Sequence, residues 1–227
     1  MNNASGEKDV EGHAGLSESD ALKRHWKKIY EQSPVEKLGW YEERPEPSLK
    51  LIHEALPDKR SQILHVGAGA STLVDLLLEE GYENMWVNDI SEEALRQIKE
   101  RLGENAKRIH WLIDDLIHPR KINQLRNIDC WHDRAVLHFF TRPEEQKIYF
   151  KLLRKVLRPG GHVLIAAFNK EGARKCSGLP VCRYDAEMLS RQLGPEFRLI
   201  KSFDYLYTMP SGEPRPYVYA WFQRALT

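Results

Sequence analysis

Short apolar runs and helical repeats of apolar residues alternate through the middle of this 227-residue chain. Runs of strand length occupy residues 63–66, 85–87, 109–113, 128–131 and 162–168. Helices are expected over residues 72–80, 91–103, 143–156 and 185–193, and two late strands near 197–203 and 217–222. Strands that alternate with helices are typical of a parallel sheet covered by helices on both faces. The pattern therefore predicts the α/β class with a doubly wound sheet.

The chain divides into three regions by its apolar content. Residues 1–16 hold only three large apolar side chains, too few to offset the entropy of ordering, so we expect a disordered tail. Residues 17–60 begin with a run of helix N-cap residues, after which Trp26 and Tyr30 share one helical face. Residues 61–227 carry the alternating pattern, and no linker divides them.

Charge and composition narrow the class of protein. The chain has 34 Lys and Arg residues against 33 Asp and Glu, a net charge of +1, which does not favour binding of duplex nucleic acid. No apolar run approaches the roughly 18 residues of a membrane-spanning helix, and the N-terminus lacks the pattern of a signal peptide. The three cysteines have neither disulfide nor metal-ligand spacing. We therefore expect a cytoplasmic protein without a membrane anchor or a metal site.

The turn after the first strand is typical of a nucleoside site. The strand at 63–66 runs into Gly67, Ala68 and Gly69 before a helix begins. Glycine lacks the Cβ that would keep a ligand away from the backbone. Asp89 stands twenty residues after Gly69, at the end of the second strand, where its carboxylate can accept hydrogen bonds from both hydroxyls of a ribose.

Three common ligands contain such a nucleoside. The chain has no phosphate-binding G-x-x-x-x-G-K-[ST] motif, which disfavours a nucleoside triphosphate. Thr72 stands where a dinucleotide fingerprint has glycine or alanine, which disfavours NAD mildly and leaves a nicotinamide-dependent oxidoreductase as a distant alternative. The remaining ligand is S-adenosylmethionine, which has a ribose but no pyrophosphate.

From about residue 20 to its end, the chain resembles the class I S-adenosylmethionine-dependent methyltransferases. The resemblance is carried by residues 66–71, 87–91, 114–116, 129–134 and 157–161. It implies a Rossmann-like, seven-stranded sheet in the order 3-2-1-4-5-7-6 with the last strand antiparallel. It also implies that the nucleoside is held by Asp89 with Ile90 and by Asp115 with Leu116. His65 and Ser71 depart from the first motif, which leaves the contacts to the amino-acid end of the cofactor open.

The N-terminal aromatic residues extend this resemblance. Trp26 and Tyr30 followed by Trp40 are similar to the aromatic lid of thiopurine and thiol methyltransferases. The similarity implies that residues 17–60 form a helical lid region in which Trp26 and Trp40 cover the cofactor, whereas core packing is the alternative for Trp26 and Tyr30. The loops at 175–180 and 209–212 are expected at the same end of the sheet.

A polar run follows the fourth strand, at the end of the sheet where open α/β proteins bind ligands. We predict Asp133, Arg134 and His138 as catalytic residues, with His138 as the proton acceptor because an ordinary histidine titrates near neutral pH. His132 is expected to pack along the cofactor. Two alternatives stay open: Asp133 and Arg134 pair with each other, or His138 is a satisfied loop histidine.

The methyl acceptor remains a choice between classes. The leading hypothesis is a small-molecule thiol, amine or hydroxyl compound, because about 60 residues precede the core and no target-recognition domain is inserted. A protein lysine is the alternative. A transfer RNA is third, supported only by the basic helix face at 23–28. A protein that binds S-adenosylmethionine without catalysis is the non-enzymatic alternative.

Overall fold

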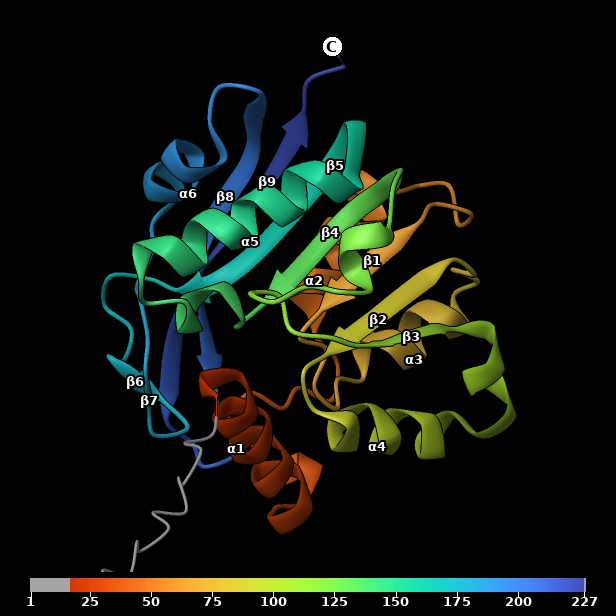
Figure 1. Ribbon diagram of the computed structural model, residues 1–227, viewed down its shortest axis with the longest axis vertical. Helices are drawn as coiled ribbons and strands as arrows, with labels where there is room; N and C mark the ends of the chain where they lie inside the picture. The colour runs from red at the N-terminus through yellow and green to blue at the C-terminus, as the bar shows by residue number, and fades with distance from the viewer. Residues whose placement is uncertain (1–16, 227) are drawn as a thin grey trace, which may run out of the picture.

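The computed structural model describes residues 17–226, so the predicted disordered tail lies outside the described residues. The chain forms a central sheet of seven strands. Figure 1 shows helices in front of this sheet and behind it. The strand order is β3-β2-β1-β4-β5-β9-β8. The strands are β1 (Ile63–Val66), β2 (Met85–Asp89), β3 (His110–Ile113), β4 (Ile128–Arg134), β5 (Leu157–Phe168), β8 (Phe197–Thr208) and β9 (Pro214–Arg224). Strand β9 pairs antiparallel with β5 and β8, and the strands from β3 to β5 are parallel. The predicted order is confirmed.

Helices cover both faces of this sheet. They are α1 (Glu18–Gln32), α2 (Glu46–Ala55), α3 (Leu73–Glu79), α4 (Glu92–Leu102), α5 (Pro143–Val156) and α6 (Ala186–Leu193). Adjacent strand residues point to opposite faces, so Cys130 of β4 packs in one apolar core with α2, α3 and α4. Its neighbour Trp131 packs in the other core with α5 and α6. The fold is therefore doubly wound.

Several short elements and boundaries differ from the sequence prediction. Single 3-10 turns occur at Val35–Lys37, Gly103–Arg108, Ile122–Gln124 and Leu137–Phe139, and a small hairpin joins β6 (Lys175–Cys176) to β7 (Leu179–Pro180). Strand β5 begins at Leu157, five residues before its predicted start at residue 162. Strand β4 continues to Arg134, three residues beyond its predicted end. Within residues 17–226, the structure has no helix that is long and apolar enough to span a bilayer.

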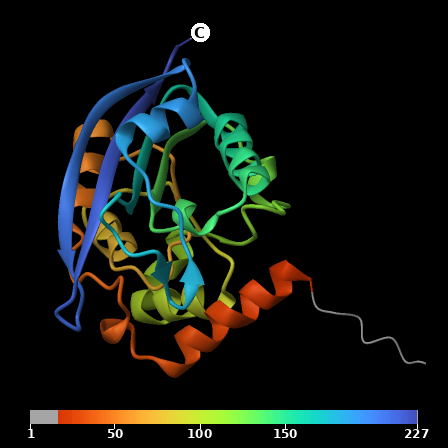
Figure 2. The same ribbon diagram turned by 90° about the vertical axis from the view of Figure 1, so that its left-hand side faces the viewer.

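The N-terminal segment has two structurally different parts. Helix α2 buries Leu49, Ile52 and Ala55 in the core shared with α3 and α4. Helix α1, by contrast, has a single buried residue, Tyr30. Figure 2 shows α1 lying across the end of the molecule at which the parallel strands finish. Helix α2 therefore belongs to the core, whereas α1 lies over the carboxyl ends of the parallel strands.

Candidate active site

A cavity of about 750 Å³, counted with its open mouth, lies at the carboxyl ends of the parallel strands beneath α1. Among the predicted site residues it brings together Trp26, Trp40, Gly67, Asp89, Ile90, Asp115, Leu116 and Arg134. A second cavity of about 500 Å³ adjoins it and contains the predicted residues Ala68 and His132. Trp40, Gly67 and Arg134 line both cavities. The two cavities are therefore neighbours, with these three residues lying against both.

The glycine turn after β1 forms the floor of the first cavity. Gly67 and Gly69 have φ angles of +55° and +57°, which side chains other than glycine adopt at a cost. A Cβ on Gly67 would stand 2.1 Å from a methyl carbon of Val136, and one on Gly69 would stand 2.4 Å from the hydroxyl of Tyr30. Both positions therefore require glycine for conformation and for space.

Asp89 fixes this turn from the end of β2. Its carboxylate accepts hydrogen bonds from the backbone N–H of Gly69 at 2.8 Å and of Ser91 at 2.7 Å. Burial raises the pKa of Asp89 to about 6, although these N–H groups favour the ionised form. Each carboxylate oxygen keeps a further lone pair, so the group can still accept hydrogen bonds from a ligand in the cavity.

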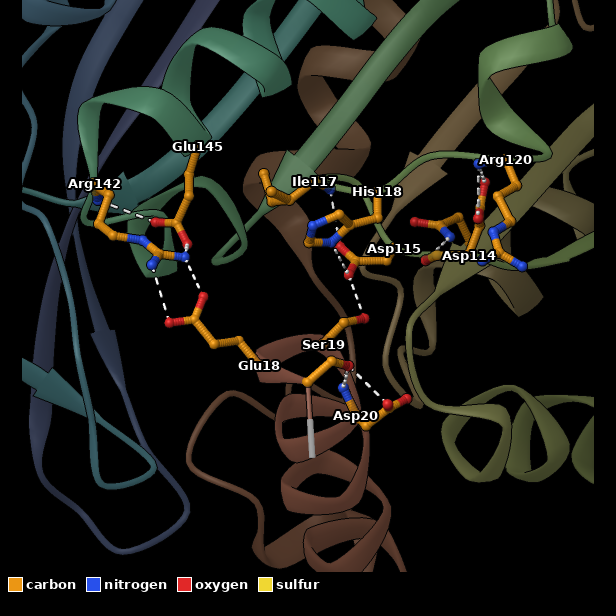
Figure 3. A network of polar contacts seen from close by, with 12 residues as sticks. Glu18, Ser19, Asp20, Asp114, Asp115, Ile117, His118, Arg120, Arg142 and Glu145 are labelled. Carbon is orange, nitrogen blue, oxygen red and sulfur yellow. Dashed lines mark hydrogen bonds and ion pairs between the residues drawn. The ribbon is translucent and has the colours of Figure 1, made fainter. Parts of the chain in front are cut away.

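The two adjacent acids after β3 have different surroundings. Asp114 accepts hydrogen bonds from the backbone N–H groups of Arg120, Lys121 and Ile122, so it shapes the following loop. Asp115 accepts one from the backbone N–H of Ile117 at 2.9 Å and one from the hydroxyl of Ser19 at 2.6 Å. Figure 3 shows Asp115 directed toward α1 while Asp114 faces the Arg120 loop. A ligand can therefore reach the carboxylate of Asp115 by taking the place of the Ser19 hydroxyl.

Aromatic rings close the side of the first cavity that faces α1. The ring of Trp26 makes edge-on contacts with Trp40 at 5.7 Å and with Phe139 at 5.1 Å between centroids. Tyr30 lies 6.1 Å from Trp40 in the same manner. Phe139 was not predicted as a site residue, although its place directly after the polar run of β4 is a usable sequence signal. The rings form an apolar wall on this side of the cavity.

The N-terminal end of α1 is held by polar contacts at two places. Besides the bond from Ser19 to Asp115, the guanidinium of Arg142 donates hydrogen bonds to Glu18 at 2.6 and 3.0 Å and to Glu145 at 2.8 Å (Figure 3). Arg142 and Glu18 are both exposed. Exposed ion pairs contribute little to stability, so this end of α1 can be released at low cost.

The polar run of β4 does not converge on the cavity as predicted. Asp133 is fully buried on the α5 side, where it accepts hydrogen bonds from the hydroxyl of Tyr149 at 2.6 Å and from the backbone N–H groups of Val136 and Leu137. Burial raises the pKa of Asp133 to about 6. It therefore stabilises the turn after β4 and does not line either cavity.

His138 lines neither cavity. It is fully buried between the rings of Phe139 and Phe168, with centroid distances of 4.5 and 4.6 Å. Neither ring nitrogen has a hydrogen-bond partner among the described residues. Burial lowers the pKa of His138 to about 3, which leaves the imidazole neutral. A role as proton acceptor would require the residue to move.

Arg134 is the member of the predicted catalytic group that lines the cavity. Its Nε lies 2.8 Å from the carboxylate of Glu42, and its Nη1 donates to the carbonyl oxygen of Trp40 at 2.9 Å. The guanidinium also stacks near Tyr207 and Tyr217, at 5.1 and 5.2 Å. The alternative in which Arg134 pairs with Asp133 is wrong, because strand alternation sends the two side chains to opposite faces. Glu42 was not predicted, since nothing in its local sequence separates it from an exposed loop acid.

The fold and this site define the architecture of the class I methyltransferases. Residues 63–161 match a family model described as a methyltransferase domain. The chain is 30% identical over 146 residues to the eEF1A lysine and N-terminal methyltransferase of Bos taurus, covering 62% of this chain and 20% of that protein. It is 23% identical over 187 residues to EEF1A lysine methyltransferase 2 of Danio rerio, covering 80% and 73%. The chain thus spans about a fifth of the Bos taurus relative, and 13% of its Mus musculus counterpart.

Solved structures share the fold at low sequence identity. A methyltransferase of Anabaena variabilis described as dependent on S-adenosylmethionine aligns with a TM-score of 0.72 and 17% identity, covering 92% of this chain and 96% of that one. The N-methyltransferase NodS of Bradyrhizobium japonicum, solved with S-adenosylhomocysteine, aligns with a TM-score of 0.64 and 16% identity, covering 88% and 98%. The matched domain and the shared fold support the predicted class, a class I S-adenosylmethionine-dependent methyltransferase, and the predicted cofactor.

The residues of the first cavity fit the nucleoside half of this cofactor. The turn at Gly67 and Gly69 leaves no room for a Cβ, Asp89 keeps free acceptor positions, and Asp115 offers an acceptor for an amino group. When bound, S-adenosylmethionine supplies a methyl group that is already activated for displacement. The protein then has to orient the nucleophile and exclude water. The aromatic rings on the α1 side of the cavity are placed to do the second.

Proposed function

We propose that the protein transfers the methyl group of S-adenosylmethionine to a small-molecule acceptor. The observation that carries the proposal is the enclosure of the first cavity: the nucleoside acids, the glycine turn and the wall of aromatic rings share one hollow that α1 covers. Such an enclosed apolar hollow suits a small acceptor better than a folded macromolecule. A cytoplasmic location, expected from the sequence, is part of the same proposal.

The lining also bears on the kind of nucleophile. The cavity has no histidine among its described lining residues, and its acids lie beside the glycine turn and at the end of β3. An acceptor that must lose a proton to become nucleophilic would therefore find no histidine base in the first cavity. A thiol, which can form its thiolate in solution, or an amine, which can lose its proton there, fits this lining better than an alcohol.

A panel of acceptors tests the proposal. Purified protein would be incubated with S-adenosylmethionine carrying a labelled methyl group and with matched thiol, amine and hydroxyl compounds, and transfer to each would be counted. We expect transfer to at least one thiol or amine, and loss of it in Asp89→Ala. Transfer to none of the small molecules, together with transfer to a lysine peptide, would refute the small-molecule proposal.

A protein lysine is the second candidate, and one surface feature favours it. An open groove of about 840 Å³ runs between the loop at 36–44 and the end of β8, lined by Glu36, Glu43, Tyr41, Tyr205 and Tyr207. Glu36 and Glu43 are exposed and form no ion pair with any described residue. Acids and aromatic rings together attract a lysine side chain. The relatives named as lysine methyltransferases agree with this candidate.

The double variant Glu36→Gln/Glu43→Gln separates the two candidates. If a lysine peptide is the substrate, we expect the variant to raise its KM at low salt while kcat stays within twofold. Transfer to a small thiol or amine should not change. Glu187, an exposed acid on α6, provides a matched control as Glu187→Gln.

A further inference from the structure

Ala135 lines the first cavity in a backbone conformation that favours glycine. Its φ angle is +67°. In the part of the chain that the structure describes, the other two non-glycine residues with a positive φ are Asn127 and Ser177. Asparagine adopts such angles more readily than most residues, and Ser177 stands beside Gly178 in the turn between β6 and β7. Of the three, Ala135 is the residue that borders the candidate active site.

The turn after β4 imposes this conformation on Ala135. The N–H of Ala135 donates to the carbonyl oxygen of Ala166 on β5 at 2.8 Å. The carboxylate of Asp133 accepts hydrogen bonds from the next two backbone N–H groups, at 3.0 and 3.1 Å. The side chain of Val136 lies against Gly67, where a Cβ would not fit. Because these contacts hold the turn on both sides, the positive φ is set by the fold and not by the alanine.

The methyl group of Ala135 therefore has a cost that glycine would avoid. Glycine adopts a positive φ freely, whereas an L residue with a Cβ is strained there. Ala135 is half-buried, and its side chain packs at the edge of the apolar core around α2. Strained residues gather at functional sites, where the strain is kept for what the side chain does. A strained methyl group in the lining of a ligand cavity indicates that it shapes that cavity.

The strand order indicates which part of the cofactor this methyl group meets. Asp89 and Asp115 follow β2 and β3, which lie on one side of β1, whereas Ala135 follows β4 on the other side. The nucleoside fits the side of the two acids, so the sulfonium group of S-adenosylmethionine extends toward the end of β4. The lining near Ala135 includes the apolar side chains of Val136 and Phe139. An uncharged group such as a methyl suits this part of the cavity.

We propose that Ala135 is a specificity-determining residue, whose methyl group borders the transferable group of S-adenosylmethionine and limits the size of what fits there. The limit applies to the group on the sulfonium sulfur and to the acceptor that approaches it. The inference deepens the proposed function and rests on it, because it assumes that the cavity is used for methyl transfer.

Ligands that differ at the sulfonium sulfur test the inference without any methyl transfer. Isothermal titration would compare S-adenosylmethionine, its S-ethyl analogue and S-adenosylhomocysteine, which has no transferable group. One methylene too many in a filled apolar pocket costs about tenfold or more in affinity. We therefore expect the wild type to bind the ethyl analogue about tenfold more weakly than S-adenosylmethionine. In Ala135→Gly this difference should disappear, while the affinity for S-adenosylhomocysteine stays the same.

A second variant makes the opposite change. Asparagine tolerates a positive φ and is larger than alanine, so Ala135→Asn should keep the turn and fill the space. It should weaken S-adenosylmethionine about tenfold more than it weakens S-adenosylhomocysteine. Asn127 has a φ of +60° and is exposed just before β4 begins, so Asn127→Gly is the matched control and should change none of the three affinities.

Urea unfolding tests the conformational argument separately. Ala135→Gly should not lower the midpoint of unfolding, because relief of the positive φ offsets the loss of one half-buried methyl group. A clearly lower midpoint would show that Ala135 is not strained and would overturn the inference.

The ligand affinities separate this inference from the proposals on which it rests. Equal wild-type affinity for the methyl and ethyl ligands, or an unchanged difference in Ala135→Gly, would overturn the inference while the cofactor assignment stands. Absence of wild-type binding to all three ligands would overturn both. If the affinities follow the expected pattern although no small molecule is methylated, the inference is supported and the proposed acceptor class is refuted.

Discussion

Replacement of Asp89 by asparagine gives the sharpest test of the nucleoside site. The carboxylate accepts two backbone N–H groups and faces the first cavity with its remaining lone pairs. In Asp89→Asn, one oxygen becomes an NH₂ group that meets either the Gly69 or the Ser91 N–H, donor against donor. The same change removes the charged acceptor for the ribose hydroxyls. One substitution therefore affects both stability and affinity.

The two effects differ in size. An N–H left without its acceptor costs about 1–3 kcal/mol. Burial raises the pKa of Asp89 from 3.8 to about 6, so the ionised side chain itself costs folding about 3 kcal/mol, which asparagine relieves. These terms nearly cancel, and the variant should stay folded. Loss of one or two hydrogen bonds to a charged acceptor, about 1.5–3 kcal/mol each, should weaken S-adenosylhomocysteine by a factor of about ten to ten thousand.

The pH dependence adds a second signature. Because the raised pKa lies near 6, the wild-type carboxylate becomes protonated as the pH falls from 7.5 to 5, and affinity should fall several-fold over this range. Asp89→Asn should bind weakly at both pH values with little change between them. Isothermal titration at pH 7.5 and 5 measures both effects, with the exposed Asp58→Asn as the control. Wild-type affinity in Asp89→Asn at pH 7.5 would refute the placement of the ribose.

Three further predictions concern the loop, the helix and the buried histidine. Gly67→Ala should lower the free energy of unfolding by roughly 1–3 kcal/mol, because of its positive φ and the contact with Val136, and Val136→Ala should recover part of the loss in urea unfolding. Arg142→Ala should leave stability nearly unchanged yet speed S-adenosylhomocysteine release several-fold in stopped-flow fluorescence, unlike the exposed control Arg60→Ala. His138→Leu should raise stability by about 1 kcal/mol, since it removes unpartnered nitrogens, and should lessen unfolding below pH 6.5. The sign follows because the folded pKa of about 3 lies below the unfolded value of 6.5, so protonation of the unfolded chain lowers stability as the pH falls. Loss of methyl transfer with intact ligand binding in His138→Leu would instead restore this residue as a catalytic candidate.

The sequence predicted the elements whose signals are local. The strand–glycine–helix unit at 63–79 and the position of Asp89 were predicted from patterns of neighbouring residues. In the structure, Gly67 and Asp89 line the same cavity. The family resemblance singled out Asp115, but the residues alone could not separate it from Asp114, because both follow the same strand and the Arg120 loop distinguishes them. Which of them a ligand meets depends on contacts made 6–96 residues away.

The error at the end of β4 has a simple geometric cause. The apolar run suggested that the strand ended at Trp131, which would have left Asp133, Arg134 and His138 in one loop. The strand continues to Arg134, so alternation divides Asp133 from Arg134 and assigns them to opposite faces. The partner of Arg134 is Glu42, 92 positions earlier, and no local pattern predicts so distant a pairing.

The role of Glu42 links the cofactor to the choice of acceptor. This residue lines the second cavity and also the acidic groove at the surface. If its carboxylate binds the ammonium group of the cofactor, the groove offers a lysine peptide Glu36 and Glu43, whose exposed charges are screened as the salt concentration rises. The KM of a lysine substrate should then rise with salt, and this salt dependence should persist in Glu42→Gln. A steep salt dependence that disappears in Glu42→Gln, with unchanged S-adenosylhomocysteine affinity, would show instead that Glu42 serves the acceptor. The affinity for S-adenosylhomocysteine and the KM for a lysine peptide, both measured on Glu42→Gln, therefore show whether Glu42 serves the cofactor or the acceptor.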